Sequence, residues 1–210
     1  MNLRTRKTIL TAIIVVLSCL TFIDPPYPEQ LLLQHSGTLL ILLFLVIDII
    51  KNKWKFSAFL GISLFTILHI IGARYIYSFV PYNEWMLNLT GFDFNEAMEY
   101  ERNHFDRFVH FSFGILIFPV IFHFAMKKTG FKVMMSVLFA WFAIQTFSLI
   151  YEVFEWGLTI FLSGEAATNY NGQQGDIWDP QKDMALAMLG SILMGIFYWV
   201  KYRVFGSSVK

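Results

Sequence analysis

The sequence is poor in cysteine and in charged residues, and both shortages limit what the protein can be. Cys19 is the single cysteine among 210 residues, so no disulfide can form within the chain. Only 15% of the residues are charged whereas 56% are hydrophobic, and the mean hydropathy is +0.55. A soluble domain cannot bury so large an apolar fraction, so the lipid bilayer must solvate much of the chain. The net charge of +1 gives no reason to expect a nucleic-acid partner.

The sequence also lacks the short motifs of several enzyme classes. It contains no phosphate-binding P-loop, no Gly-x-Ser-x-Gly nucleophile elbow and no candidate cysteine nucleophile. It shows no internal repeat and no low-complexity tract. Any catalytic chemistry must therefore come from other polar side chains.

Six apolar runs are long enough to cross the bilayer as helices, which takes about 20 residues each. They cover residues 8–23, 31–50, 56–80, 108–126, 133–162 and 184–200. The first run follows three basic residues, as a signal peptide does, but the polar stretch "DPPYPEQ" follows it in place of a small-residue cleavage site. We therefore predict an all-α, polytopic membrane protein, a six-transmembrane-helix bundle formed by a single integral membrane domain over residues 1–210.

Basic residues mark one side of this predicted bundle. Three lie in each of four segments, so these segments hold twelve of the sixteen: Arg4, Arg6, Lys7, Lys51, Lys53, Lys55, Lys127, Lys128, Lys132, Lys201, Arg203 and Lys210. Short cytoplasmic loops collect lysine and arginine, so we expect both termini in the cytoplasm. The outer loop, residues 81–105, carries Trp85, Leu89, Phe92 and Phe94, which indicates a segment lying on the membrane interface.

Carboxylates and histidines gather at the other side. The motif "QGDIWDPQKDM" places Asp176, Asp179 and Asp183 at the start of the last run, where Asp179 and Pro180 are typical of a helix start. The motif "YEVFEW" places Glu152 and Glu155 on one helical face near the outer end of the fifth run. Acidic groups in such an apolar setting normally face the interior of the bundle.

Two further runs bring polar groups to the same end. The motif "RNHFDRFVHF" leads into the fourth run and supplies His104, Asp106, Arg107 and His110. The motif "HIIGARY" in the third run supplies His69 and Arg74. We expect eight of the predicted residues to surround one cavity at the outer third of the membrane: His69, Asp106, His110, Glu152, Glu155, Asp176, Asp179 and Asp183.

In combination, "RNHFDRFVHF", "YEVFEW" and "QGDIWDPQKDM" resemble the motifs of the YjdF family of bacterial multi-pass inner-membrane proteins. The resemblance covers nearly the whole chain and includes a pattern in the third run, at His69, Gly72, Tyr75 and Tyr77. It implies location in the inner membrane of a Gram-negative bacterium, with the outer face in the periplasm. The family brings no established activity, so the chemistry must be argued from the residues.

Histidine, aspartate and glutamate are the ligands that Zn, Mn or Fe prefer in proteins. We therefore predict a divalent metal site in a hydrolase or transferase that acts on a lipid or lipid-linked substrate at the membrane boundary. The predicted metal ligands are His69, His104, Asp106, His110, Asp176 and Asp179. The predicted catalytic carboxylates are Glu152, Glu155 and Asp183. The predicted substrate-binding residues are Arg74, Arg107, Trp156 and Trp178, and Arg102 and Lys182 could also hold an anionic head group.

Three other interpretations stay open. The charges could form a purely structural ion-pair network, or the outer face could dock a periplasmic partner. Carboxylates and histidines also build proton or cation relays in transporters. Against transport, Gln145 and His69 are the only strongly polar residues in the middle of the third and fifth runs.

Overall fold

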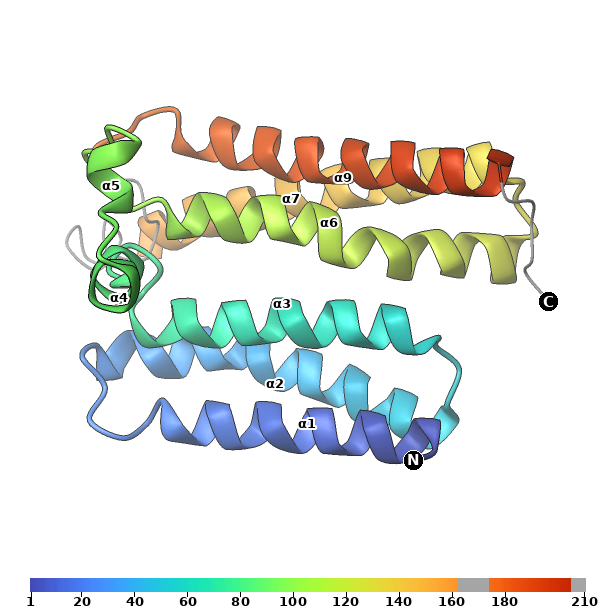
Figure 1. Ribbon diagram of the computed structural model, residues 1–210, viewed down its shortest axis with the longest axis horizontal. Coiled ribbons are helices and arrows are strands. Elements are labelled where there is room, and N and C mark those ends of the chain that lie inside the picture. Colours follow the sequence, from blue (N-terminus) through green and yellow to red (C-terminus); the bar gives the residue numbers. More distant parts are fainter. Residues whose placement is uncertain (162–173, 205–210) are drawn as a thin grey trace.

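The computed structural model describes residues 1–161 and 174–204, and all regular structure in these two ranges is helical. Six long helices in the described chain extend along the bundle (Figure 1). They are α1 (Leu3–Leu20), α2 (Pro28–Lys51), α3 (Phe56–Arg74), α6 (Phe105–Phe124), α7 (Val133–Phe161) and α9 (Asp179–Val204). A π-helical turn, η1 (Ala125–Thr129), extends α6. Two short helices, α4 (Tyr82–Thr90) and α5 (Phe94–Ala97), lie between α3 and α6 in the chain.

Local sequence explains where several helices begin and end. The Asn2 side chain accepts a hydrogen bond from the Thr5 N–H and so caps α1. Pro28 stands at the start of α2, where its missing N–H costs nothing. Asn52 ends α2 in the left-handed conformation, and Gly91 ends α4 with a φ of 73°.

Five helical segments in the described chain are long and apolar enough to cross a membrane: α2, α3, α6 with η1, α7 and α9. The helical membrane architecture predicted from the sequence is therefore confirmed. Helix α1 falls outside this group because its 18 residues include Arg4, Arg6 and Lys7. It nevertheless packs beside α2 and α3 (Figure 1).

The boundaries of several helices differ from the prediction. Helix α6 begins at Phe105 and α9 at Asp179, three and five residues earlier than predicted, so Asp106 and Asp183 both belong to helices. Helix α3 ends at Arg74 and not at residue 80. The predicted end of the fifth span, Leu162, and the basic residue Lys210 lie outside the described residues.

The early end of α3 has a visible cause. Ile76 and Tyr77 adopt left-handed backbone conformations, with φ of 45° and 55°, and the Tyr77 N–H donates to the Gly72 carbonyl. This turn folds the Tyr77 ring back onto α3. A Cβ on Gly72 would lie 2.6 Å from that ring, so only glycine fits there. The Tyr77 hydroxyl then forms a hydrogen bond with His69 Nδ1.

The long helices form two groups of three, α1 with α2 and α3, and α6 with α7 and α9 (Figure 1). Helices α3 and α6 join the groups. The first group is packed around Ile14, Leu45 and Phe59. The second is packed around Phe118, Phe122, Ala140 and Tyr198.

Glycines let helix α6 approach its neighbours closely. A Cβ on Gly114 would lie 2.3 Å from the Ala187 carbonyl oxygen of α9, and one on Gly190 would lie 2.4 Å from the Phe111 carbonyl oxygen of α6. A Cβ on Gly61 of α3 would lie 2.4 Å from the Leu116 carbonyl oxygen. Small residues at helix crossings allow such backbone contact in membrane bundles.

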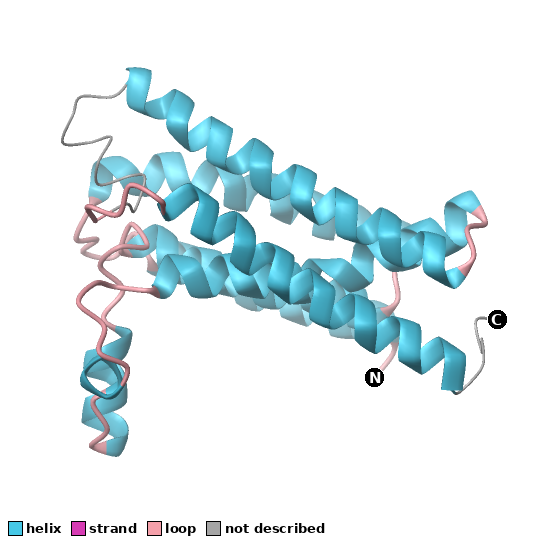
Figure 2. Ribbon diagram, turned by 90° about the horizontal axis from the view of Figure 1, so that it is seen from above, coloured by secondary structure: helices cyan, strands magenta, loops and turns pink. Residues whose placement is uncertain are grey.

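The two ends of the bundle differ in character. Helix α1 begins and α9 finishes at the same end (Figure 1). The opposite end holds α4 and α5, which project to one side of the bundle (Figure 2). We call this opposite end the α4 end.

A buried ion pair lies at the end away from α4. Lys7 has no exposed surface, and its ammonium group donates to Asp48 Oδ2 at 2.6 Å, to Asn52 Oδ1 at 3.1 Å and to the Trp54 carbonyl at 2.9 Å. The other Asp48 oxygen accepts the N–H groups of Lys53 and Trp54. The pair therefore ties α1 to the end of α2 and to the turn that follows it.

Candidate functional site

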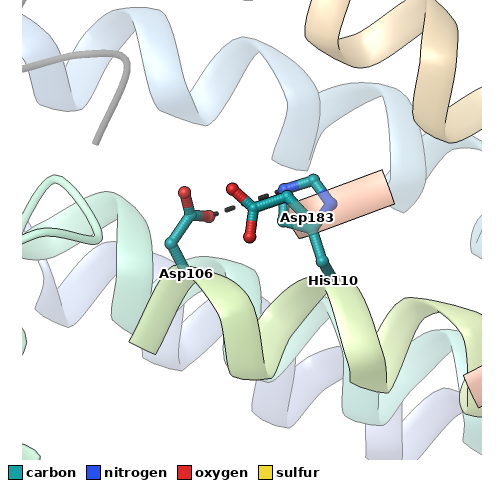
Figure 3. A group of neighbouring side chains, drawn as sticks. All are labelled: Asp106, His110 and Asp183. Carbon is teal, nitrogen blue, oxygen red and sulfur yellow. Dashed lines mark ion pairs between the residues drawn. The ribbon is translucent and has the colours of Figure 1, made fainter. Parts of the chain in front are cut away.

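Three buried side chains from two helices converge near the α4 end. Asp106 and His110 lie one turn apart on α6, and Asp183 lies on α9. One ligand atom from each lies within 4.8 Å of the other two. Figure 3 shows the carboxylates of Asp106 and Asp183 beside the His110 ring, with a dashed line for the ion pair between Asp106 and His110. We call these three residues the buried triad.

The local sequence explains this convergence. Residues four apart share one face of a helix, so Asp106 and His110 both face α9 because α6 has already begun at Phe105. Asp179 and Pro180 open α9, and Asp183 follows within the first turns. Gly114 and Gly190 hold the two helices in close contact farther along.

Helix α7 adds two buried carboxylates. Glu152 Oε1 lies 3.5 Å from His110 Nε2, and Asp106 Oδ1 lies 3.7 Å from the same nitrogen. Glu155, one turn along α7, is also buried. Glu152 Oε1 and Asp183 Oδ1 are buried and have no hydrogen-bond partner in the described chain. Buried polar atoms normally have such a partner, so these two oxygens are available to accept a further donor or a cation.

Two of the predicted metal ligands, Asp176 and Asp179, instead join a network of basic side chains. Arg102 donates to both Asp179 oxygens, at 2.7 and 3.2 Å. Arg107 pairs with Asp176 and, at 3.1 Å, with Asp179. Lys182 donates to Asp176 at 2.6 Å. We call these five residues the charged network.

The contacts of Asp176 keep it ionised. The hydrogen bond from Lys182, helped by the Trp178 N–H and by Arg107, holds the pKa of the Asp176 carboxyl well below its usual range. The carboxylate therefore already has several donors. This differs from the prediction, which made Asp176 and Asp179 metal ligands beside His110.

His104, a third predicted metal ligand, also lies outside the triad. Its ring stacks on Tyr100 with ring centres 3.8 Å apart, and its Nε2 lies 3.5 Å from Arg107 Nη1. Burial, together with the positive charges of Arg107 and Arg102, lowers the pKa of His104 below its ordinary value. The imidazole is therefore neutral beside the arginine.

The third helix keeps its polar residues on the other side of the bundle. His69 uses both ring nitrogens, one with the Tyr77 hydroxyl and one with the Gln34 carbonyl at 3.1 Å. Arg74 donates to the carbonyls of Thr21, Ile23 and Asp24. The structure thus gives His69 and Arg74 partners within the first helix group and does not bring them to the triad.

The two predicted substrate-binding tryptophans are exposed. Trp156 is 63% exposed and Trp178 is 59% exposed.

The structure brings together four of the eight residues that were expected around one cavity. These are Asp106, His110, Glu152 and Asp183, which lie in short contact or share a helix face. Glu155 is buried on the same helix as Glu152, whereas His69, Asp176 and Asp179 have other partners.

Arg102, in the long loop, has a structural partner that the sequence did not predict. The sequence indicates it only as a residue that could hold an anionic head group, whereas in the structure it forms an ion pair with Asp179 and lies 3.6 Å from Asp176. The signal in the sequence was the excess of acids over bases at the α4 end, which required cations from some neighbouring segment. The pairing of Lys7 with Asp48 gave no such signal.

The helical bundle and its apolar surface define a polytopic membrane protein. The family described as "Predicted membrane protein (DUF2238)" matches residues 6–203, and the chain belongs to this family. A curated relative, inner membrane protein YjdF of Escherichia coli strain K12, is 33% identical over 139 residues. The match covers 65% of this chain and 61% of the relative, and it confirms the resemblance found from the motifs. No solved structure matches the chain.

Proposed function

We propose that the buried triad binds one divalent metal ion, and that the protein is a metal-dependent hydrolase or transferase for a lipid or lipid-linked substrate. The observation that carries this proposal is the convergence of three buried ligand atoms within 4.8 Å. Two unpartnered carboxylate oxygens, on Asp183 and on Glu152, support it. A cation in the triad would satisfy the Asp183 oxygen and would keep the neighbouring carboxylates ionised.

The donor set suits Zn, Mn or Fe, since it combines one imidazole with carboxylates. Ligand atoms at about 2.1 Å from a common tetrahedral ion lie about 3.4 Å apart. The triad atoms are somewhat farther apart, so binding would draw the side chains of Asp106, His110 and Asp183 inwards by small rotations. A site with three protein ligands keeps a position for water or substrate.

Glu152 is the residue best placed to move a proton. Its Oε1 is buried, lacks a hydrogen-bond partner and lies beside His110. A bound metal would supply a Lewis acid and make a coordinated water more acidic. Glu152 would accept the proton of that water, and Glu155 would support it from the next turn of α7.

Transport through the bundle has less support. Phe118 lies eight residues beyond His110 on α6, which places it about 12 Å farther along the helix. It is fully buried and packs with Phe122, Ala140 and Tyr198. A continuous polar path from the triad to the other end would have to cross this apolar cluster, so the geometry favours a site open to one side only.

The inner membrane is the proposed location, in agreement with the name of the curated relative. All six long helices, α1 included, span the membrane in this proposal, with both termini cytoplasmic and the α4 end in the periplasm. The placement of twelve of the sixteen basic residues and the even number of long helices in residues 1–161 and 174–204 support that orientation.

Cysteine labelling tests the orientation. In a Cys19→Ser background, Glu84→Cys on α4 should react with a membrane-impermeant maleimide added to intact spheroplasts, because Glu84 is exposed at the α4 end. Lys53→Cys, which is exposed at the other end, should react only after the membrane is permeabilised. The reverse labelling pattern would contradict the orientation.

Metal analysis of the purified protein tests the site. We expect about one divalent ion per chain, removed by a strong chelator, with a fall in melting temperature that one of Zn, Mn or Fe reverses. Asp183→Asn and His110→Gln should lower metal affinity by at least roughly a hundredfold, because each removes a ligand and the loss of an outer-shell partner alone costs about 10–100-fold. Glu84→Gln, an exposed acid at the same end, should bind metal as the wild type does.

The reaction needs a separate measurement. Incubation of the metal-loaded protein with lipids extracted from bacterial inner membrane should release a water-soluble phosphate product or form a new lipid. Glu152→Gln should lower the rate by roughly a hundredfold or more while retaining the metal, because general base catalysis contributes about that factor. Protein that holds no metal and whose melting is unaffected by chelator would exclude the proposal in favour of a structural network.

A further inference from the structure

An apolar pocket lies beside the triad. The short helices α4 and α5 form one side of it, and the long helices α6 and α9 form the other. Its volume is about 610 Å³, within the range of roughly 300–1,000 Å³ that is usual for small-molecule sites. It is lined by Tyr82, Met86, Phe94, Tyr100, His104, Phe105, Arg107, Phe108, Phe111 and Leu186. We call it the α4 pocket.

The pocket has an apolar wall and one cationic group. Phe105, Phe108 and Phe111 line it from α6, and Leu186 lines it from α9. The Tyr82 hydroxyl is already engaged, since it donates to Asn95 and accepts from the His104 N–H. Arg107 is therefore the charged residue that a ligand meets in this pocket. Such a lining fits a molecule with a hydrocarbon part and an anionic part.

One N–H donor of Arg107 has no acceptor in the described chain. Its Nη2 group is occupied by Asp176 and Asp179, but its Nε–H is buried and has no acceptor in the described chain. The charged network contains three bases and two acids and so carries one net positive charge. An anionic group beside Arg107 would satisfy the Nε–H and balance that charge.

The pocket and the triad share the same turns of two helices. Arg107 and Phe111 directly follow Asp106 and His110 along α6, and Leu186 comes three residues after Asp183 on α9. A ligand that fills the pocket therefore lies alongside the residues proposed to bind metal.

We infer that the α4 pocket binds a phospholipid, with its phosphate on Arg107 and an acyl chain among Phe105, Phe108, Phe111 and Leu186. The membrane setting supplies such a molecule in excess, and α4, which has no buried residue of its own, would cover the chain from the interface. The lipid is a substrate only if the proposed function holds, but its binding stands on the pocket alone.

The test uses delipidated protein in detergent and native mass spectrometry with three probes. Phosphatidylglycerol should bind. A diacylglycerol with the same chains should bind at least roughly tenfold more weakly because it lacks the phosphate, and inorganic phosphate should bind at least roughly tenfold more weakly because it lacks the acyl chains. Arg107→Lys keeps the positive charge but loses the Nε–H. It should weaken phosphatidylglycerol binding severalfold and leave diacylglycerol binding unchanged.

A matched pair of variants tests the pocket itself. Leu186→Trp should fill the pocket and weaken phosphatidylglycerol binding by roughly tenfold or more. Leu189→Trp adds the same side chain on the same helix, where Leu189 is 46% exposed, and should bind as the wild type does. Equal binding by both variants, or equal binding of phosphatidylglycerol and diacylglycerol, would each overturn the inference.

Asp183→Asn separates this inference from the proposed function. Asp183 is a triad residue and does not line the pocket. If the wild type binds no metal and Asp183→Asn still binds phosphatidylglycerol with wild-type affinity, the proposed function fails and the lipid site stands. If metal binding is intact but the Leu186 and Arg107 variants bind lipid normally, the lipid site fails and the metal site stands.

Discussion

Replacement of Lys7 by methionine should lower the free energy of unfolding by about 3–5 kcal/mol, the cost of leaving one partner of a buried ion pair alone. Lys7 is fully buried and Asp48 is 3% exposed, so water cannot replace the lost ammonium group. Asp48 would keep the Lys53 and Trp54 N–H groups on one oxygen but lose the Lys7 ammonium on the other. Helix α1 would then separate most readily from α2.

Two controls make this prediction specific. Lys51→Met removes an exposed base at the end of α2 and should leave the melting temperature unchanged within error. The double variant Lys7→Met, Asp48→Asn should recover much of the loss, because asparagine still accepts the two backbone N–H groups without a buried charge. Thermal melting in detergent compares the four proteins. A Lys7→Met protein that melts at the same temperature as Lys51→Met would show that the ion pair does not stabilise the fold.

Lys7 also illustrates how far the sequence could predict the fold. The apolar runs and the spacing of basic segments were sufficient for the helical membrane architecture, because each depends only on local composition. From the sequence, Lys7 is one of three bases before the first run, which predicts only that it lies on the cytoplasmic side. Its partner lies 41 residues away, and the pairing depends on how α1 packs on α2. Periodicity within one helix carries no information of that kind.

The site shows the same division between local and distant information. The spacings of Asp106 with His110 and of Glu152 with Glu155 predicted shared helical faces, and the structure buries all four side chains. The sequence could not assign Asp176 and Asp179 to bases, because Arg102 and Arg107 reach them from about 70 residues away or more. The sequence could not predict the turn at Ile76 and Tyr77, which gives His69 its hydrogen-bond partner, because neither position is glycine or proline. The expectation that His69 lies beside the triad follows from that gap.

Substitution of alanine for Gly114 should destabilise the bundle by about 3 kcal/mol, at the upper end of the usual cost of overpacking. The new Cβ would lie 2.3 Å from the Ala187 carbonyl oxygen and 2.8 Å from the Ser191 nitrogen. Both are backbone atoms of α9, so no side chain can rotate away and the helices must separate. Gly190→Ala should act similarly, because its Cβ meets the Phe111 carbonyl oxygen at 2.4 Å.

The glycines of the long helices offer a graded series of controls. A Cβ on Gly195 would lie 3.3 Å from a Val137 side-chain atom, so Gly195→Ala should cost much less than Gly114→Ala. A Cβ on Gly157 meets nothing within 4 Å, so Gly157→Ala should be neutral or slightly stabilising through helix propensity. The melting temperatures of the three alanine variants check the packing directly: Gly114→Ala should melt lowest, Gly195→Ala next and Gly157→Ala highest. If all three variants melt alike, α6 and α9 are not in backbone contact.

The same substitution should affect the triad, because Asp106 and His110 lie on one side of that helix crossing and Asp183 on the other. Separation of α6 from α9 would move the carboxylate of Asp183 away from the other two ligands. Gly114→Ala protein that remains folded at low temperature should therefore bind the metal at least roughly tenfold more weakly than Gly157→Ala protein, since displaced ligands cost affinity even when none is removed. Metal titration of the two variants at a temperature below both melting points measures this difference. Equal affinities would mean that the close contact at Gly114 holds the helices together without setting the geometry of the triad.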